Sequence, residues 1–245
     1  MLVKLENPIL LSKAIELISE LVTEVRIKVN DFGMSITAMD PANVSMVGFK
    51  LPKSAFSRFE SGPEILGVNL DNLKKILRRC GIKSSLILEK KENLLNIIIE
   101  DRILRNFKLS LIEIESEDID FDAKTERMEF SSRVELNSED FIASIEDCAV
   151  VADACSFIIK DNKFIIEAKS LNSAMSEFSG DEAIIQAEDC KSRYSLEYLQ
   201  KFLKGAKIVN KTILYFADDH PLKILFKTEN MTLAFVLAPR IETED

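Results

Sequence analysis

Apolar residues recur at helical spacing in two segments of this chain that lie 126 positions apart. Leu70, Leu73 and Leu77 occupy positions i, i+3 and i+7, which form one face of an α-helix. The matching residues in the second segment are Leu196, Leu199 and Leu203. The sequence therefore predicts two amphipathic helices at equivalent places in an internal repeat.

A second pair of helices belongs to the same repeat, at an offset of 130 positions. Asn7 and Pro8 are typical of the N-cap and first position of a helix, and Asn137 caps the matching segment. Short β-rich runs between turn signals repeat as well: residues 33–38 with 163–168, 86–88 with 212–214, and 95–99 with 222–226. Each half is therefore predicted to contain a strand, a helix, several strands, a second helix and several more strands.

An acidic segment separates the two halves. Residues 113–126 contain seven Asp or Glu, one Lys and no glycine, which is typical of a solvated, extended connection. Ile119 and Phe121 are exceptions, because at i and i+2 of an extended chain they share one side and form an apolar edge that either docks on the body or awaits a partner. We predict two similar domains, 1–112 and 128–245, joined by a loop at 113–127, with a short acidic tail at 242–245.

Composition restricts the class of protein. The 245 residues are 47% hydrophobic, enough for two cores of about 120 residues each. The four cysteines form no CxxC motif, so neither a zinc site nor a disulfide framework is indicated. No apolar run approaches the roughly 18 residues of a membrane span, and the N-terminus lacks a signal-peptide core. We expect a cytoplasmic protein without metal, cofactor or membrane contact.

Positive charge occupies the same place in both leucine-faced helices. Lys74, Lys75 and Arg78 form a stripe on the other face of the first helix. The equivalent residues of the second helix are Gln200, Lys201 and Lys204. In a chain of net charge −9, two equivalent basic helix faces indicate contact with a polyanion.

One cluster permits an enzymatic interpretation. Asp218, Asp219 and His220 are consecutive and include the only histidine, a combination that can hold a metal or perform acid–base chemistry. They precede Pro221 between two predicted strands, where such residues are ordinary in turns. The sequence has no P-loop, GxGxxG or GxSxG motif. We predict a protein without catalysis and keep a metal-dependent enzyme as the disfavoured alternative.

Two motifs resemble the signature of a known family. Residues 33–46 are Gly-Met-Ser-Ile-Thr-Ala-Met-Asp-Pro-Ala-Asn-Val-Ser-Met, and residues 237–242 are Leu-Ala-Pro-Arg-Ile-Glu. Both resemble the archaeal and eukaryotic sliding clamps, the proliferating cell nuclear antigen (PCNA) family. The first helix, residues 67–77, the acidic connector and residues 194–199 follow in the family order, so the resemblance spans the whole chain.

The resemblance implies an α+β DNA clamp fold with two similar domains per chain, in which helices line the interior of a ring and antiparallel sheets form its outside. It implies a processivity factor that encircles duplex DNA and tethers DNA polymerase and other replication and repair enzymes, in the cytoplasm and associated with the nucleoid. A checkpoint-type clamp subunit, which loads at DNA damage, is the alternative with the same fold.

Sequence-independent binding of duplex DNA needs only cations near phosphates. The predicted DNA-binding residues are Lys74, Lys75, Arg78, Arg79, Lys83, Lys201, Lys204 and Lys207. The resemblance also places the other two helices in the hole, although both are acidic and residues 137–151 contain no cation. Their acids lie at its rim or keep contacts weak enough for sliding.

The resemblance further implies a groove for short docking motifs of DNA polymerase, flap endonuclease, DNA ligase and the clamp loader. By matching position the groove residues are Met39, Asn43, Val44, Met46, Ile119, Phe121, Leu237, Ala238, Pro239, Arg240 and Ile241. Methionines suit such a site because they are flexible and polarizable. Asn43 departs from the His or Arg more often found at its position.

Ring closure in this family joins a strand of the first domain, here 105–111, to a strand of the next subunit's second domain, here 173–179. The predicted subunit-interface residues are Arg105, Phe107, Leu109, Leu111, Ser173, Met175 and Phe178. Such a head-to-tail contact closes by rotation, and two-domain subunits complete a pseudo-sixfold ring with three copies. We predict a homotrimer, with a heterotrimer of paralogues as the alternative.

Overall fold

The computed structural model describes residues 1–115 and 118–241, so the predicted tail at 242–245 lies outside the described residues. The chain forms two compact units. Unit 1 comprises Met1–Pro41, Val47–Phe121 and Thr228–Leu233, and unit 2 comprises Ala42–Met46, Asp122–Lys227 and the residues from Ala234 onward. The chain therefore passes between the units more than once.

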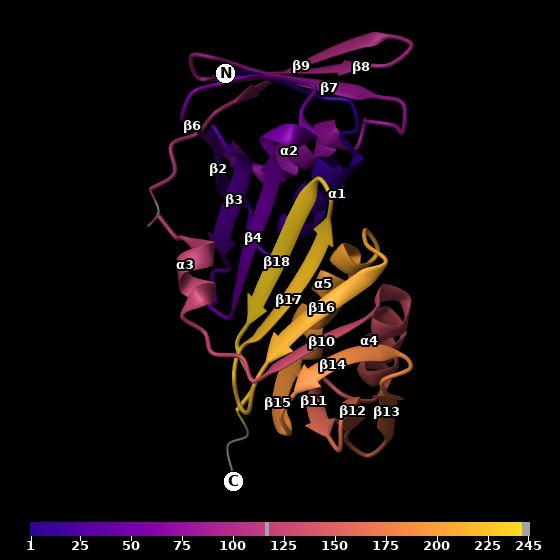
Figure 1. Ribbon diagram of the computed structural model, residues 1–245. Coiled ribbons are helices and arrows are strands. Elements are labelled where there is room, and N and C mark those ends of the chain that lie inside the picture. The colour runs from indigo at the N-terminus through magenta and orange to yellow at the C-terminus, as the bar shows by residue number, and fades with distance from the viewer. Residues whose placement is uncertain (116–117, 242–245) are drawn as a thin grey trace. The chain divides into compact units, whose positions relative to one another are not determined.

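Unit 1 contains two helices and two groups of antiparallel strands (Figure 1). Its strands are β1 (Leu2–Leu5), β2 (Glu24–Asn30), β3 (Gly33–Met39), β4 (Ser45–Pro52), β5 (Arg58–Glu60), β6 (Glu64–Asn69), β7 (Ser85–Lys91), β8 (Leu94–Glu100) and β9 (Leu104–Ser110), with a 3-10 turn at Lys53–Ala55. The strand orders are β5-β1-β7-β8-β9 and β6-β2-β3-β4. Helices α1 (Ile9–Ile18) and α2 (Leu70–Leu77) pack against each other.

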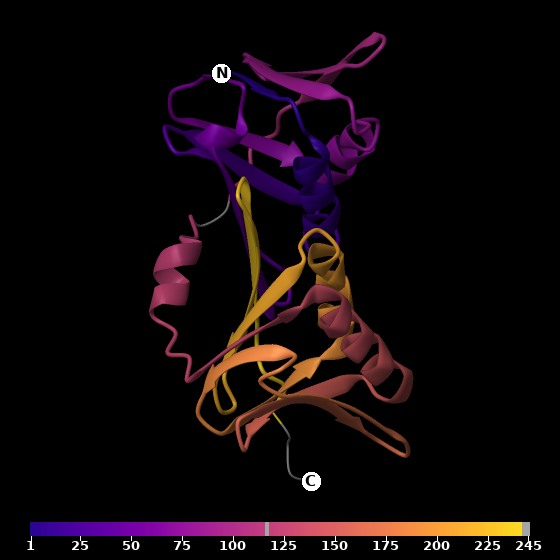
Figure 2. The ribbon, with the colours of Figure 1, turned by 45° about the vertical axis from the view of Figure 1, so that its right-hand side comes forward.

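Unit 2 repeats this plan. Its strands are β10 (Ser132–Asn137), β11 (Ala154–Lys160), β12 (Lys163–Lys169), β13 (Ser173–Phe178), β14 (Ala183–Ala187), β15 (Cys190–Ser195), β16 (Lys211–Phe216), β17 (Leu222–Thr228) and, in its second half, β18 (Met231–Leu237). They are ordered β14-β10-β16-β17 and β13-β12-β11-β15. Helices α4 (Ser138–Val151) and α5 (Leu196–Ala206) lie side by side (Figure 2). The predicted α+β class with a repeated antiparallel arrangement is confirmed.

The repeat assigns each strand a counterpart. Counting along the chain, β4 corresponds to β13 and β9 corresponds to β18. In unit 1, Met231–Leu233 of β18 lies beside β4. By contrast, β9 and β13 each end a sheet. Both β9 in unit 1 and β13 in unit 2 are therefore edge strands, whereas their counterparts β18 and β4 are neighbours.

Capping side chains fix where the helices begin. The Asn69 side chain accepts a hydrogen bond from the backbone N–H of Asn72, and the Asn137 side chain accepts one from Glu139. The first helix begins one residue later than predicted, although the Asn7 side chain does accept a hydrogen bond from the backbone N–H of Ile9 at 3.3 Å. The carbonyl of Pro8 accepts the first helical bond, from Ser12 at 2.9 Å, which makes Pro8 the N-cap. No helix among the described residues is long and apolar enough to cross a membrane.

The acidic connector is not extended throughout, which corrects the sequence-based expectation. Its second half forms the short helix α3 (Phe121–Glu126). The residues after Phe121 favour a helix, with an acid in the first turn and Ala, Lys and Glu following. Phe121 itself is buried. Since α3 begins at Phe121, Ile119 and Phe121 do not form the continuous extended edge that their spacing suggested.

The two units are stabilised by different cores. The buried side chains of unit 1 are mostly Leu, Ile and Val, whereas unit 2 is centred on aromatic rings. Phe157 lies edge-on to Phe164, Tyr194 and Phe216, with ring centroids 5.3 to 5.9 Å apart. Such edge-to-face contacts are favourable beyond simple burial. In both units the core holds the helices against the strands.

Candidate functional site

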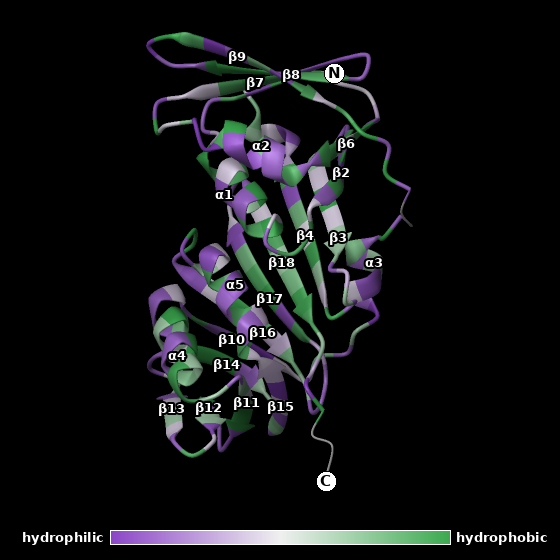
Figure 3. Cartoon of the chain, turned by 180° about the vertical axis from the view of Figure 1, so that it is seen from behind, coloured by the Kyte–Doolittle hydropathy of each residue, from purple (hydrophilic) through white to green (hydrophobic). Residues whose placement is uncertain are grey.

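The leucine faces of α2 and α5 are buried, so their basic stripes face outward. All six leucines of the repeated pattern are less than 5% exposed, as the periodicity predicted. Figure 3 shows hydrophilic and hydrophobic residues alternating along both helices. Of the eight predicted DNA-binding residues, Lys74 and Lys201 are half-buried, and the exposed ones are Lys75, Arg78, Arg79, Lys83, Lys204 and Lys207.

Three of these cations are held by carboxylates of their own unit. The pairs are Asp71–Lys74 at 3.0 Å, Glu197–Lys201 at 3.0 Å, and Glu16–Arg78. The third pair joins α1 to α2, and periodicity within one helix gave no signal for it. By contrast, Lys75, Arg79, Lys83 and Lys207 form no ion pair with any residue that the structure describes.

The acids of α4 occupy two places. Glu139 and Asp140 lie in its first turn, where negative charge is favourable because the helix dipole is positive there. Glu146 and Asp147 are exposed near its other end. Helix α4, which carries both pairs, packs on β12 and on the edge strand β13.

Two glycines of unit 1 make contacts that leave no room for a side chain. We call these two contacts, Gly67 with Ile112 and Gly48 with Phe121, the seats of the connector. A Cβ on Gly67 would lie 2.0 Å from the carbonyl oxygen of Ile112, whose N–H donates to Gly67 O at 3.0 Å. A Cβ on Gly48 would lie 2.5 Å from the ring of Phe121. Each contact is closer than any side chain allows. The chain therefore lies on the body of unit 1 just before the connector, at Ile112, and again at Phe121 within it.

An ion pair fixes the connector between these seats. The Asp118 carboxylate accepts a hydrogen bond from Lys28 Nζ on β2, and Arg26 lies 3.8 Å from the same oxygen. The bond from Lys28 holds the pKa of the Asp118 carboxyl below its ordinary value. Asp118 was not among the predicted site residues, because one acid in a run of acids has no distinguishing pattern.

Two of the predicted groove residues meet in one pocket of unit 1. Met39 and Ile119 line a cavity of about 220 Å³ together with residues of β2, β3 and the connector. The remaining lining residues are Val22, Glu24, Val25, Arg26, Thr37, Ala38 and Ile114. Most of this wall is apolar, with Glu24 and Arg26 as the charged members. The pocket suits a ligand that presents an apolar side chain next to a polar group.

The C-terminal motif, which contains further predicted groove residues, is held within unit 2 by two backbone hydrogen bonds. The N–H of Ala238 donates to Val44 O at 2.9 Å, and the N–H of Arg240 donates to Arg193 O at 2.7 Å. The motif is thus held in line with β15. Arg240 also pairs with Asp153 at 2.9 Å.

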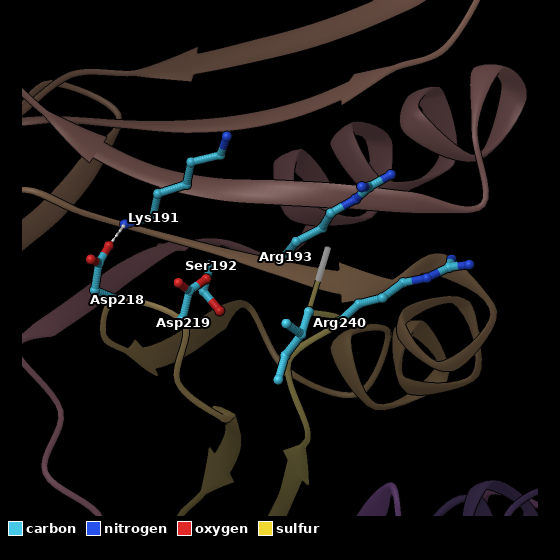
Figure 4. A pocket seen from close by; sticks show the side chains of 7 residues that line it. Lys191, Ser192, Arg193, Asp218, Asp219 and Arg240 are labelled. Atoms are coloured by element: carbon cyan, nitrogen blue, oxygen red, sulfur yellow. Dashed lines mark hydrogen bonds between the residues drawn. The ribbon is translucent and has the colours of Figure 1, made fainter. Parts of the chain in front are cut away.

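A second cavity, of about 370 Å³, lies where the C-terminal motif meets β15. Its lining residues are Lys191, Ser192, Arg193, Asp218, Asp219, Arg240 and Ile241. Figure 4 shows Lys191 and Arg193 extending the same way from the strand, and the Asp218 carboxylate accepting a hydrogen bond from Lys191 N–H at 2.8 Å. Arg240 and Ile241 are the predicted groove residues found here. The pocket is charged, unlike the one in unit 1.

Three of the predicted groove residues are buried and cannot touch a peptide in this conformation. Met46, Phe121 and Leu237 are 4%, 5% and 0% exposed. Their side chains pack in the core, which corrects their predicted role as contact residues. The surface is left to the exposed and half-exposed members, Met39, Asn43, Val44, Ile119, Ala238, Pro239, Arg240 and Ile241. Asn43 has a positive φ of 56°, a turn conformation that Asn tolerates.

The predicted interface residues differ in burial. On β9, Leu109 is buried, Arg105 and Phe107 are half-buried, and Leu111 after the strand is also half-buried. On β13, Ser173 and Met175 are exposed, whereas Phe178 stacks on Phe164 inside unit 2. Phe178 and Leu109 are therefore core residues, which corrects their assignment as contact residues.

Exposed apolar side chains that the sequence reasoning missed gather beside both edge strands. Near β9 these are Ile82, Ile103 and Leu104, and near β13 they are Val150 and Leu171. Two hydrogen bonds bring their loops together: Ser84 with Asp101, and Ser170 with Val151 O. No periodic signal marks them, because they lie in turns and at element ends.

Asp218, Asp219 and His220 serve the turn between β16 and β17. Asp218 accepts from Lys191 N–H, and Asp219, at φ 45°, donates its own N–H to Lys191 O. His220 lies edge-on to Phe130 at 5.3 Å. Among the described residues no three His, Cys, Asp or Glu form a group that could hold a metal ion.

Known proteins resemble this chain along nearly its whole length. A family model described as "Proliferating cell nuclear antigen, N-terminal domain" matches residues 1–124. A "DNA polymerase sliding clamp" of Pyrococcus furiosus is 33% identical over 239 residues, 94% of each chain, and one of Thermococcus fumicolans is 35% identical over 232 residues, 91% of this chain and 92% of the relative. The crystal structure of proliferating cellular nuclear antigen from Entamoeba histolytica shares the fold, with a TM-score of 0.89 over 98% of both chains at 24% identity.

Proposed function

This chain belongs to the proliferating cell nuclear antigen family of DNA polymerase sliding clamps, and we propose that three copies of it close a ring around duplex DNA. The clamp tethers DNA polymerase as a processivity factor and performs no catalysis itself. The observation that carries this proposal is the repeat: each unit has a basic helix face, and β9 in one unit and β13 in the other are edge strands whose counterparts β18 and β4 are neighbours. Nothing in the sites favours a checkpoint clamp or a metal-dependent enzyme.

The DNA surface consists of the exposed cations of α2 and α5 and the loops after them. Two equivalent stripes in each chain give a trimer six similar stripes, which suits a duplex whose phosphates repeat regularly. Because these cations can only contact phosphates, binding is independent of sequence and weakens as salt rises. We place the protein in the cytoplasm, associated with the nucleoid through this surface.

The chain contains an example of the contact that closes the ring. Within unit 1, β4 has part of β18 as its neighbour. The repeat counterparts of these two strands are β13 and β9, and each of these ends a sheet. We infer that β9 of one copy pairs with β13 of the next in the same way. Backbone hydrogen bonds give this contact its strength, and Ile82, Ile103, Leu104, Val150, Leu171 and Met175 cover it with apolar surface.

Charge favours identical copies over paralogues. The edge at β9 carries exposed Arg102 and Lys108, whereas the helix beside β13 carries exposed Glu146 and Asp147. One edge of this chain is thus complementary to its other edge, and like edges repel. A homotrimer of about 83 kDa (3 × 27.7) follows from this arrangement.

Light scattering on a charge-swap series tests the ring. Wild-type protein is expected at the trimer mass, and Arg102→Glu with Lys108→Glu shifts it to monomer, since like charges then meet. Mixing that variant with one carrying Glu146→Lys and Asp147→Lys should restore assembly. The control is Lys160→Glu with Lys227→Glu, two exposed lysines outside both edges, which stays trimeric. A monomeric or dimeric wild type at tens of micromolar contradicts the proposal.

The groove binds partner enzymes through short peptides with apolar anchors. We propose that the pocket at Met39 and Ile119 takes such an anchor, and that flap endonuclease, DNA ligase and the clamp loader use the same groove as polymerase. Ile119→Ser should weaken capture of a docking-motif peptide by about 1 to 3 kcal/mol, because a few buried anchors dominate such interfaces. Ile65→Ser, an exposed residue of β6 outside the pocket, is the matched control. Equal affinity of both variants in calorimetry would show that the pocket is misplaced.

A further inference from the structure

We propose that Asp71, Glu197 and Glu16 set how weakly this clamp holds DNA, by neutralising one cation each on the surface that faces the duplex. This inference rests on the proposed DNA contact of α2 and α5 and extends it. Cations alone explain attraction, whereas a ring that slides also needs contacts that break easily. The three carboxylates supply this property.

The repeat provides the first evidence. Asp71 and Glu197 lie 126 residues apart, the same offset as the leucine faces, and each is the second residue of its helix. Each pairs with a lysine of the basic stripe on its own helix, at 3.0 Å in both cases. The lysines are Lys74, one turn after Asp71, and Lys201, one turn after Glu197. The acid and its lysine partner thus occur together in both units.

Glu16 provides independent evidence from a different element. It projects from α1 and pairs with Arg78 of α2. No intrahelical spacing requires this contact. Three of the eight predicted DNA-binding cations are therefore engaged with carboxylates before DNA arrives.

Counterion release explains the effect. A cation that contacts a phosphate contributes to affinity by releasing ions condensed on DNA. A cation already paired with a carboxylate must first exchange that partner, and the displaced carboxylate then faces the phosphates. Exposed pairs such as these are weak enough to open. The ion pair therefore reduces the affinity gained from each cation–phosphate contact without preventing that contact.

A purely structural role makes the opposite prediction. Asp71 and Glu197 lie in the first turns of their helices, where a negative charge also stabilises the helix dipole. If this were their whole role, their neutral variants would lower stability and leave DNA binding unchanged or weaker. The proposal expects tighter binding. The two roles differ in the sign of the change.

The test compares intact wild-type clamp with Glu16→Gln/Asp71→Asn/Glu197→Gln on a short linear duplex, by fluorescence anisotropy over a salt series. Each freed cation should steepen the slope of log affinity against log salt by about 0.9. When salt falls from about 200 mM to about 50 mM, the affinity of the variant should therefore rise about threefold more, per freed cation, than the affinity of the wild type. The triple variant should also leave linear DNA more slowly. The charge-conserving Asp71→Glu/Glu197→Asp variant should retain the wild-type slope.

The matched control removes three carboxylates that pair with cations of the sheets. It is Glu60→Gln/Glu89→Gln/Glu135→Gln, whose partners Arg58, Lys91 and Arg133 lie at 2.8, 2.9 and 2.7 Å. Net charge changes equally in both triple variants, so the control should keep the wild-type slope. Equal tightening in both variants would assign the effect to net charge and overturn the inference.

Two other outcomes are decisive. If the wild type binds DNA and the α-helical triple variant binds equally or more weakly, the carboxylates are structural and the inference fails while the proposed function stands. If neither protein shows salt-dependent attraction to DNA, the proposed DNA surface itself fails. The wild-type curve therefore separates the two conclusions.

Discussion

At the scale of single residues, burial decides which members of a motif can meet a partner. Leu237 and Ile241 lie four positions apart in the C-terminal motif, yet Leu237 is fully buried and Ile241 is 77% exposed. The difference arises because β18 ends at Leu237 and the chain then follows β15 through the bond from Arg240 to Arg193. Leu237 is thus a core residue and Ile241 a surface residue of the same motif.

This difference predicts opposite effects of truncation. Leu237→Ala should lower the free energy of unfolding by about 2 to 5 kcal/mol, because it leaves a cavity in a packed core. Ile241→Ala should change it by less than about 0.5 kcal/mol. Melting temperatures at one fixed protein concentration compare the two. Equal melting points for both variants would show that Leu237 is not packed as described.

The pH dependence of one thiol offers a second test at this scale. Burial raises the pKa of the Cys80 thiol to about 11, with Arg105 opposing and Asp101 reinforcing the shift. Because the thiolate is the reactive form, only about one Cys80 in a thousand is reactive at pH 8. Its alkylation by iodoacetamide, followed by peptide mass spectrometry, should rise about tenfold per pH unit from pH 8 to pH 10. A plateau near pH 9 would contradict this environment.

At the scale of elements, the connector is defined by what it lies on. Ile112 lies against Gly67, Phe121 lies against Gly48, and Lys28 binds Asp118 between these two contacts. The basis of this arrangement is the absence of a side chain at two strand positions. The acidic composition of the connector alone predicts an extended loop. These contacts instead hold the connector on unit 1, and the helix α3 begins at Phe121, where the second contact lies.

Filling one seat should release the connector. Gly48→Ala places a methyl group against the Phe121 ring, which has to move, so we expect a loss of about 1 to 3 kcal/mol in stability and faster trypsin cleavage after Lys124. Gly62→Ala is the control, because nothing lies within 4 Å of its added Cβ. If trypsin cleaves Gly48→Ala no faster than the control, Phe121 does not depend on the space left by Gly48.

The same elements show how far the sequence could be interpreted. Helices α2 and α5 were predictable because three leucines at helical spacing repeat with their cations. The pair between Glu16 and Arg78 and the contact of Phe121 with Gly48 were not, because each depends on a residue far away in the chain. Periodicity reports which face of an element is apolar. It does not report which distant element covers that face.

At the scale of the whole molecule, the repeat is the basis of the proposed ring. The two units have the same order of elements, and the edge strands β9 and β13 are the counterparts of β18 and β4, which are neighbours within the chain. The exposed apolar residues Ile82, Ile103, Leu104, Val150 and Leu171 came only from the structure, because they lie in turns and at the ends of elements. The motifs could therefore identify the edge strands, but only the fold could show which side chains cover them.

The most direct test of the account is topological. Clamp loaded on a closed circular plasmid is challenged with salt high enough to suppress phosphate contacts, and the plasmid is then linearised by a single cut. A ring around the duplex should remain on the closed circle at that salt and be lost after the cut, as measured by co-elution of protein with DNA in gel filtration. Protein that leaves the closed circle as readily as the linear DNA, or that stays equally well on DNA with free ends, would contradict a clamp that encircles its substrate.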